Sequence, residues 1–263
     1  MSAIHFYKYQ GTGNDFVIMD NRNGQYDFLT EEQVHFLCDR RFGIGADGLM
    51  LLNNYEGYDF GMKYYNADGR ESSMCGNGGR CLVAFARKMG LNSEVLRFMA
   101  IDGPHEATMK GSDWVNLKMQ DVNGVEIGNL YFYLNTGSPH FVKFVDDVKA
   151  LDVFEEGRQI RYNDRFKAVG TNVNFVQPTD NGIFVRTYER GVEDETYSCG
   201  TGVTAAALMT SGTEEKTYTV PVQTLGGGLE VRFTKTGERE YKDIWLCGPA
   251  TLVFEGEIST PAK

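Results

Sequence analysis

Apolar segments bounded by glycine or polar turn residues recur along the chain and predict β-strands over most of its length. Residues 115–119 and 229–233 alternate apolar and polar side chains, as a strand with one face in the core does. Residues 16–19 are apolar throughout and are also interpreted as a strand. The pattern therefore indicates a sheet-rich protein.

Three segments predict helices instead. Residues 78–89 and 202–211 lack a polar face in their middle, and glycines at 90 and 212 end them. Helices without a polar face are buried, so we expect both to lie inside the fold. A third helix, over 31–40, opens with Thr30 and Gln33 at the spacing of a capping box.

Several short motifs recur about 124 positions apart in the same order. The run 75–78, Cys-Gly-Asn-Gly, resembles 199–202, Cys-Gly-Thr-Gly, and Thr-Gly at 12–13 recurs at 136–137. Gly-Ala-Asp at 45–47 likewise matches Gly-Thr-Asn at 170–172. Matches in constant order predict two copies of one fold, whereas chance similarity of glycine-rich turns is the alternative.

These patterns predict an α+β protein with two pseudo-symmetric domains. Each domain is expected to be a mostly antiparallel or mixed β-sheet wrapped around a central helix. We place the domains at 1–118, carrying Cys75, and 119–250, carrying Cys199. The sequence leaves open whether residues 251–263 join the first domain.

Composition excludes several classes of protein. Asp and Glu outnumber Lys and Arg by 36 to 26, and a net charge of −10 argues against nucleic acid or an anionic membrane as partner. No apolar run approaches the ~20 residues of a membrane-spanning helix, and the first residues lack signal-peptide features. The five cysteines have no disulfide framework spacing, which favours a reducing, cytoplasmic setting.

Glycine is the one unusual component, at 31 of 263 residues against a usual ~7%. Much of the excess lies in the recurring motifs. We expect these glycines where the backbone approaches a ligand or turns tightly.

The two repeated cysteines each come directly before a predicted helix. Backbone N–H groups and the positive end of the helix dipole lower the pKa of a thiol placed there and can hold a carboxylate. Two such thiols on opposite faces of one carbon can remove a proton and return it to the other face. The sequence therefore predicts cofactor-free inversion of a stereocentre next to a carboxylate.

Other interpretations of the cysteines and glycines are weaker. Cys38, Cys81 and Cys247 are expected to be inert core residues. A zinc site lacks closely spaced ligand pairs, so no metal site is predicted. The glycine-rich run at 76–80 could cradle phosphate but has no nucleotide-binding signature, and a cysteine protease using His140 lacks a local motif.

Taken together, the motifs resemble the diaminopimelate epimerase family along nearly the whole chain. The resemblance rests on residues 11–16, 41–48, 65–69, 75–81, 137–140, 170–175, 188–192, 195–202 and 248–250. It implies interconversion of LL- and meso-diaminopimelate without a cofactor, in lysine and cell-wall precursor synthesis. It also implies a homodimer with the active site in the cleft between the two domains.

The resemblance also implies roles for individual residues. Cys75 and Cys199 match the two acid–base thiols, as proton donor and acceptor for one direction of the reaction, and His140 and Glu189 match residues that support them. Positions that match substrate-binding residues are Asn14, Asn66, Gly76, Asn77, Asn172, Glu189, Arg190, Gly200 and Thr201.

Two positions depart from the family pattern. Ser138 stands where an asparagine that binds substrate is commonest, so its contact with substrate stays an open expectation. Gly48 stands where some members carry glutamine.

Related alternatives are a racemase of proline or hydroxyproline, and an amino-acid-binding or redox-sensing protein with a Cys75–Cys199 disulfide. The adjacent charges of Glu189 and Arg190 favour a substrate with a second charged end.

Overall fold

Strands of both pairing directions build each of two units in the computed structural model, which describes residues 3–259. Unit 1 is Met1–Leu117 together with Pro249–Lys263, and unit 2 is Lys118–Gly248. Residues 1–2 and 260–263, which fall within the expected domains, lie outside the described residues. The α+β fold class is confirmed, because each unit combines a mixed sheet with two helices.

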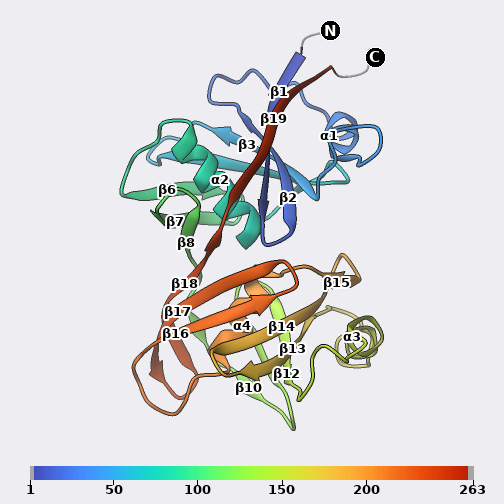
Figure 1. Cartoon of the computed structure of the whole chain (residues 1–263), viewed down its shortest axis with the longest axis vertical. Coiled ribbons are helices and arrows are strands. Elements are labelled where there is room, and N and C mark those ends of the chain that lie inside the picture. The colour runs from blue at the N-terminus through green and yellow to red at the C-terminus, as the bar shows by residue number, and fades with distance from the viewer. Residues whose placement is uncertain (1–2, 260–263) are drawn as a thin grey trace. The chain divides into compact units, whose positions relative to one another are not determined.

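Unit 1 holds its longer helix against one face of the sheet and its shorter helix against the other (Figure 1). Its helices are α1 (Glu31–Cys38) and α2 (Gly76–Lys88). Its strands are β1 (Ala3–Gly11), β2 (Asn14–Asp20), β3 (Gly48–Asn53), β4 (Phe60–Asn66), β5 (Glu71–Ser72), β6 (Val95–Ala100), β7 (Gly103–Lys110), β8 (Trp114–Lys118) and β19 (Thr251–Ser259).

The strand β19 pairs antiparallel with β1 along its full length, from Ala3 opposite Ser259 to Gln10 opposite Thr251. This pairing answers the question that the sequence left open for residues 251–259. The last strand of the chain therefore completes the sheet of unit 1.

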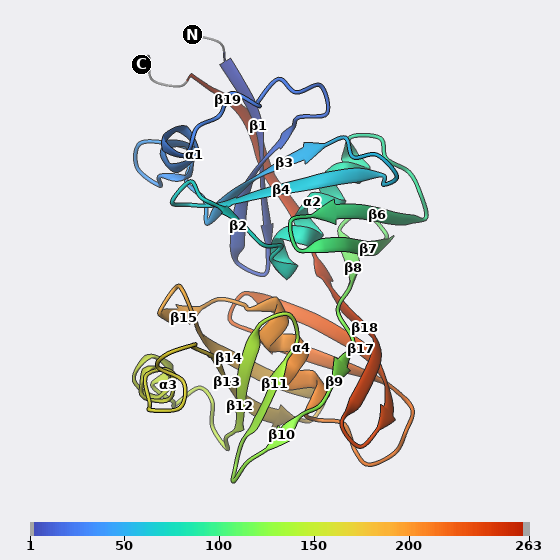
Figure 2. The same ribbon diagram turned by 180° about the vertical axis from the view of Figure 1, so that it is seen from behind.

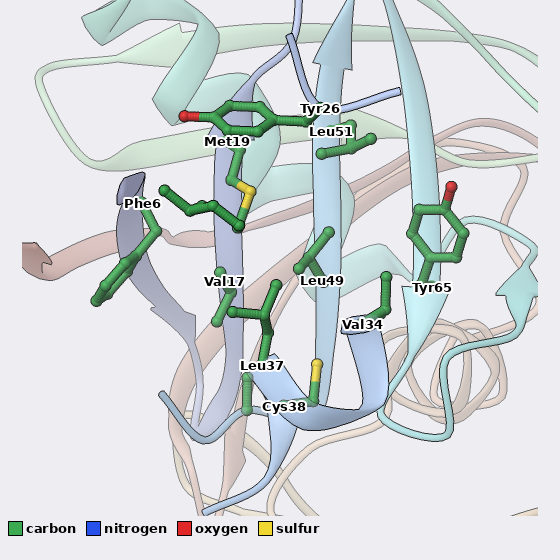
Figure 3. Packing of buried hydrophobic residues seen from close by; sticks show 12 residues of the cluster. Phe6, Val17, Met19, Tyr26, Val34, Leu37, Cys38, Leu49, Leu51 and Tyr65 are labelled. Carbon is green, nitrogen blue, oxygen red and sulfur yellow. The ribbon is translucent and has the colours of Figure 1, made fainter. Parts of the chain in front are cut away.

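The central strands of unit 1 are apolar on both faces because helices cover both. Val17 and Leu49 point toward α1, where they pack with Leu37 (Figure 3). The alternate residues Phe16 and Met50 lie against Gly78 of α2. This two-sided burial explains why 16–19 and 49–52 are continuous apolar runs.

Unit 2 has the same kind of arrangement, a mixed sheet with two helices (Figure 2). Its helices are α3 (Val153–Arg161) and α4 (Gly200–Leu208). Its strands are β9 (Val122–Asn123), β10 (Glu126–Ile127), β11 (Phe132–Asn135), β12 (Pro139–Phe144), β13 (Asn172–Thr179), β14 (Gly182–Glu189), β15 (Asp194–Thr196), β16 (Thr217–Thr224), β17 (Gly227–Gly237) and β18 (Glu240–Pro249).

Pairing directions follow the same order in the two units. In unit 1, β2 is parallel to β3, β3 antiparallel to β4, and β4 parallel to β6. In unit 2, β12 is parallel to β13, β13 antiparallel to β14, and β14 parallel to β16. One helix lies between the first parallel pair, and a second precedes the last parallel strand. The repeated motifs therefore occupy equivalent places in one repeated topology.

The helices differ from expectation in two respects. The helices α2 and α4 begin at Gly76 and Gly200, directly after the cysteines, rather than at 78 and 202. The helix α3 was missed, because its short amphipathic pattern is interrupted by Gly157. The capping box of α1 is present as predicted. Within residues 3–259, no helix is long and apolar enough to cross a membrane.

Candidate active site

Cys75 is the N-cap residue of α2, with extended backbone angles and a half-buried side chain. The first turn of a helix leaves its N–H groups without partners inside the helix, and the dipole favours negative charge there. The residues Gly76 and Asn77 supply the first of these groups. This position suits both a thiolate and a bound carboxylate.

Asn14, at the start of β2, contacts the thiol of unit 1 directly. Its Oδ1 lies 3.5 Å from Cys75 Sγ and also accepts from Asn77 Nδ2 at 3.3 Å. Its Nδ2 donates to Asp47 Oδ2 at 2.6 Å. Asn14, Cys75, Gly76 and Asn77 are thus brought together at one end of the sheet.

Asn66 lies at that same end but is exposed. It is the last residue of β4 and pairs in register with Gly48, the first residue of β3. Its carbonyl accepts from the Gly69 N–H at 2.9 Å, which closes a tight turn. Asn66 therefore lies at the same end of the sheet of unit 1 as the other predicted residues.

Cys199 is the N-cap residue of α4 and is 7% exposed. Its Sγ lies 3.5 Å from Thr201 Oγ1, and either atom can be the donor. The Thr201 carbonyl accepts from Thr136 Oγ1 at 2.8 Å, which fixes the first turn of α4 against the loop before β12. Unit 2 thus presents Cys199, Gly200 and Thr201 together.

Ser138, Asn172 and Arg190 form a second group at this end of unit 2. Asn172 Nδ2 donates to Ser138 Oγ at 2.9 Å, and Asn172 Oδ1 accepts from the backbone N–H of Arg190 at 2.9 Å. Arg190 Nη2 lies 3.4 Å from Ser138 Oγ. Asn172 is only 3% exposed, so its amide mainly ties these strands together, whereas the Arg190 guanidinium is exposed.

His140 and Glu189, the predicted supporting residues, differ in environment. His140 is fully buried on β12, and burial together with the charge of Arg190 lowers its pKa to about 3. Its Nδ1 is 3.1 Å from Asn174 Nδ2, so the neutral ring carries its proton on Nε2. Glu189 ends β14, half-buried, and accepts from Thr196 Oγ1 at 2.8 Å. His140 is therefore a neutral side chain near pH 7 rather than a charged acid.

The remaining cysteines are core residues, as expected. Cys38, Cys81 and Cys247 are 3%, 0% and 0% exposed. Burial raises the pKa of Cys38 and of Cys81 to about 12, so both thiols stay protonated near neutral pH. In the part of the chain that the structure describes, no three His, Cys, Asp or Glu side chains gather as metal ligands would.

Two residues of the thiol surroundings were not predicted from the sequence. Asp47 binds the Asn14 amide, and Arg80, fully buried on α2, donates to Asn77 Oδ1 at 3.0 Å. The internal repeat contained a signal for Asp47, because it aligns with Asn172, a predicted site residue. No comparable signal marks Arg80, since Thr204 occupies the corresponding place in α4.

Comparisons with known proteins identify one family over nearly the whole chain. The family profile described as diaminopimelate epimerase matches residues 6–125 and 132–253. A diaminopimelate epimerase from Flavobacterium psychrophilum is 51% identical over 259 residues, covering 97% of this chain and 100% of that protein. The diaminopimelate epimerase of Chlorobaculum tepidum is 44% identical, covering 95% and 99% of the two chains.

Solved structures share the fold at low identity. A phenazine biosynthesis protein of the PhzF family from Bacillus anthracis superposes with a TM-score of 0.76 and 16% identity, covering 98% of this chain and 100% of that one. A hydroxyproline epimerase from Agrobacterium vitis gives a TM-score of 0.68 and 14% identity, covering 97% and 92%. At such identities the likeness establishes the architecture alone.

Proposed function

The chain belongs to the diaminopimelate epimerase family, and we propose that it interconverts LL- and meso-diaminopimelate by exchanging the proton on one α-carbon. The observation that carries the proposal is the pair of cysteines at equivalent helix N-caps, each beside polar side chains at one end of its sheet. One thiolate takes the α-proton as the other thiol gives its proton to the opposite face. The carbon is inverted, and the two sulfurs exchange protonation states.

The partners of the two sulfurs support different resting roles. Cys75 lies against the Asn14 Oδ1, which only accepts, and an acceptor favours a protonated thiol. Cys199 lies against the Thr201 hydroxyl, which can donate to a thiolate. We therefore assign Cys75 as proton donor and Cys199 as proton acceptor for one direction, with the roles reversed for the other.

The substrate carries two carboxylates and two ammonium groups. We propose that the first-turn N–H groups at 76–77 and 200–201 hold the carboxylate next to the reacting carbon, where negative charge develops. The exposed guanidinium of Arg190 suits the distant carboxylate, and Glu189 suits an ammonium group. Asn66, Asn172 and Ser138 complete the proposed contacts, with Ser138 acting through its hydroxyl.

The remaining parts of the proposal follow from the mechanism and the family. Proton exchange on two faces of one carbon requires both thiols at one substrate, so we propose an active site shared by the two units. We also propose a homodimer, a cytoplasmic location, and catalysis that needs no metal or organic cofactor.

The decisive experiment is epimerisation of LL-diaminopimelate in deuterium oxide, with chiral separation of the products and mass measurement. We expect meso product carrying one deuterium at the α-carbon. Cys75→Ala and Cys199→Ala should each lose at least about a thousandfold in kcat/KM, because each removes an acid–base group. Cys38→Ala, which removes a buried thiol outside the proposed site, is the matched control and should keep most activity.

Two outcomes would contradict the proposal. Wild-type turnover in both variants would exclude the two-thiol mechanism. Turnover of proline or hydroxyproline, with none of diaminopimelate, would assign the fold to a different racemase, and a substrate panel at equal concentration separates these cases.

A further inference from the structure

Asp47 lies directly before β3 and holds the amide of Asn14 in one orientation. Its Oδ2 accepts from Asn14 Nδ2 at 2.6 Å and from the backbone N–H of Asp15 at 3.2 Å. Its Oδ1 accepts from Arg40 Nη2 at 2.7 Å. Both carboxylate oxygens are therefore occupied by donors, and the group can receive only the NH2 side of the Asn14 amide.

The other side of the amide shows the same orientation independently. Asn14 Oδ1 receives Asn77 Nδ2 at 3.3 Å and lies 3.5 Å from Cys75 Sγ. If the amide were turned over, its oxygen would meet the Asp47 carboxylate and its NH2 would meet the NH2 of Asn77. The first contact would then bring two acceptors together and the second two donors, so the turned amide is strongly disfavoured.

We propose that Asp47 is a positioning residue that fixes the Asn14 amide so that an acceptor, and not a donor, faces the Cys75 thiol. An acceptor stabilises the protonated thiol, whereas an amide N–H in its place would stabilise the thiolate. Asp47 thereby keeps Cys75 as the thiol that gives its proton. This role rests on the proposed function, in which one resting thiol is an acid and the other a base.

The test is a double-mutant cycle in which the alkylation rate of Cys75 is measured in the absence of substrate. Wild type, Asp47→Asn, Asn14→Ala and the double variant are alkylated with iodoacetamide from pH 5 to 9, and the Cys75 peptide is quantified by mass spectrometry. Asparagine keeps the shape of Asp47 but can also donate, so the stronger of the two contacts that orient the Asn14 amide is lost and the turned amide becomes populated. We expect Cys75 alkylation at pH 7 to rise about three- to tenfold in Asp47→Asn, the effect of one hydrogen bond.

The double variant separates orientation from charge. In the Asn14→Ala background, adding Asp47→Asn should change Cys75 alkylation by less than about twofold, because no amide remains to be oriented. Titratable groups on α2 and on the elements packed against it include Arg80, Cys81, Tyr9 of β1, Asp15 of β2, His105 of β7 and Glu255 of β19. These groups are the same in all four proteins, so their influence cancels in the cycle.

Two further thiols in each sample serve as controls. Cys199, whose Sγ lies 3.5 Å from Thr201 Oγ1 of unit 2, should keep its alkylation rate, and buried Cys38 should stay unreactive unless the protein unfolds. No change in Asp47→Asn, or an equal rise with and without Asn14, would overturn the inference. The alkylation result stands apart from the proposed function, whose failure would appear only as absent epimerisation by wild type.

Discussion

Gly202 and Gly78 occupy equivalent places in the two repeats, yet alanine should destabilise the protein far more at 202 than at 78. A Cβ on Gly202 would lie 2.2 Å from Asn174 Oδ1, about 1 Å too close for an ordinary contact. Asn174 is fully buried, and its side chain binds His140 Nδ1, the Phe141 carbonyl and the Thr187 hydroxyl at 3.0–3.1 Å. Alanine at 202 must therefore displace a side chain that holds three hydrogen bonds.

The energy of this displacement follows from the groups affected. Each buried polar group left without its partner costs about 1–3 kcal/mol, while replacing a helical glycine by alanine returns about 1 kcal/mol. We expect Gly202→Ala to lower the free energy of unfolding of unit 2 by about 2–4 kcal/mol and its Tm by about 10 °C.

Gly78→Ala is the matched control. Its Cβ would meet Met50 Sδ at 3.3 Å and the Phe16 ring at 3.4 Å, and a methionine side chain can move aside. The expected change is within about 1 kcal/mol. Urea and thermal unfolding of Gly202→Ala is followed by the fluorescence of Trp245 in unit 2, in a Trp114→Phe background. Unfolding of Gly78→Ala is followed by the fluorescence of Trp114 in unit 1, in a Trp245→Phe background. Equal stability of the two alanine variants would refute the reasoning.

Three other predictions concern charge and oxidation. The pKa of His140 is about 3 in the folded protein and ~6.5 in the unfolded chain. As the pH falls from 6.5 toward 3, only the unfolded chain gains this proton, so the folded protein loses stability over that range. Urea melts at pH 7.5 and 5 should show a loss of about 2 kcal/mol that His140→Gln does not share. Asp15→Asn should lower the free energy of unfolding, measured in urea melts, by about 3–5 kcal/mol. The reason is that Lys8 is only 6% exposed, and the substitution removes the carboxylate that lies 2.6 Å from its ammonium group. Mild oxidation should join Cys75 to Cys199 and abolish activity until reductant is added, whereas full activity of a protein with that disulfide confirmed by mass spectrometry would contradict the two-thiol mechanism.

The repeat carried more structural information than the local patterns did. Helix α3 was missed because only Asp152, as N-cap, and Glu155 mark its start, and Gly157 weakens its middle. Its counterpart α1 was predicted from a capping box, and shifting that helix by the repeat distance of 124 falls on α3. A weak local signal is thus recovered when the second copy of the fold is considered.

The glycine excess has a broader cause than the sequence alone indicated. Turns with positive φ account for Gly13 and Gly137 in the matched motifs, as expected. Gly78 and Gly202 instead lie on buried helix faces, where an added Cβ would touch the sheet at 78 and overlap with it at 202. These glycines permit close packing of helix on strand, a need that depends on the distance between elements and is not encoded in any local pattern.

The equivalent positions of the two units explain why one scaffold gives its two sulfurs different partners. Asn14, Asp47 and Asn77 of unit 1 correspond to Ser138, Asn172 and Thr201 of unit 2. In unit 1 the Asn77 side chain is held by Thr12 and Arg80 at its oxygen, and Asn14 is the neighbour that reaches the sulfur.

In unit 2 the shorter Ser138 binds Asn172 instead, and the Thr201 hydroxyl is the group beside Cys199. If both thiols had the same neighbours, the fold would not favour protonation of one over the other. Exchanging amide for hydroxyl at two equivalent positions places an acceptor at one sulfur and a potential donor at the other. The proposed two-thiol reaction requires such an asymmetry. Its source is the set of side chains that differ between the repeats, on a backbone topology that both repeats have.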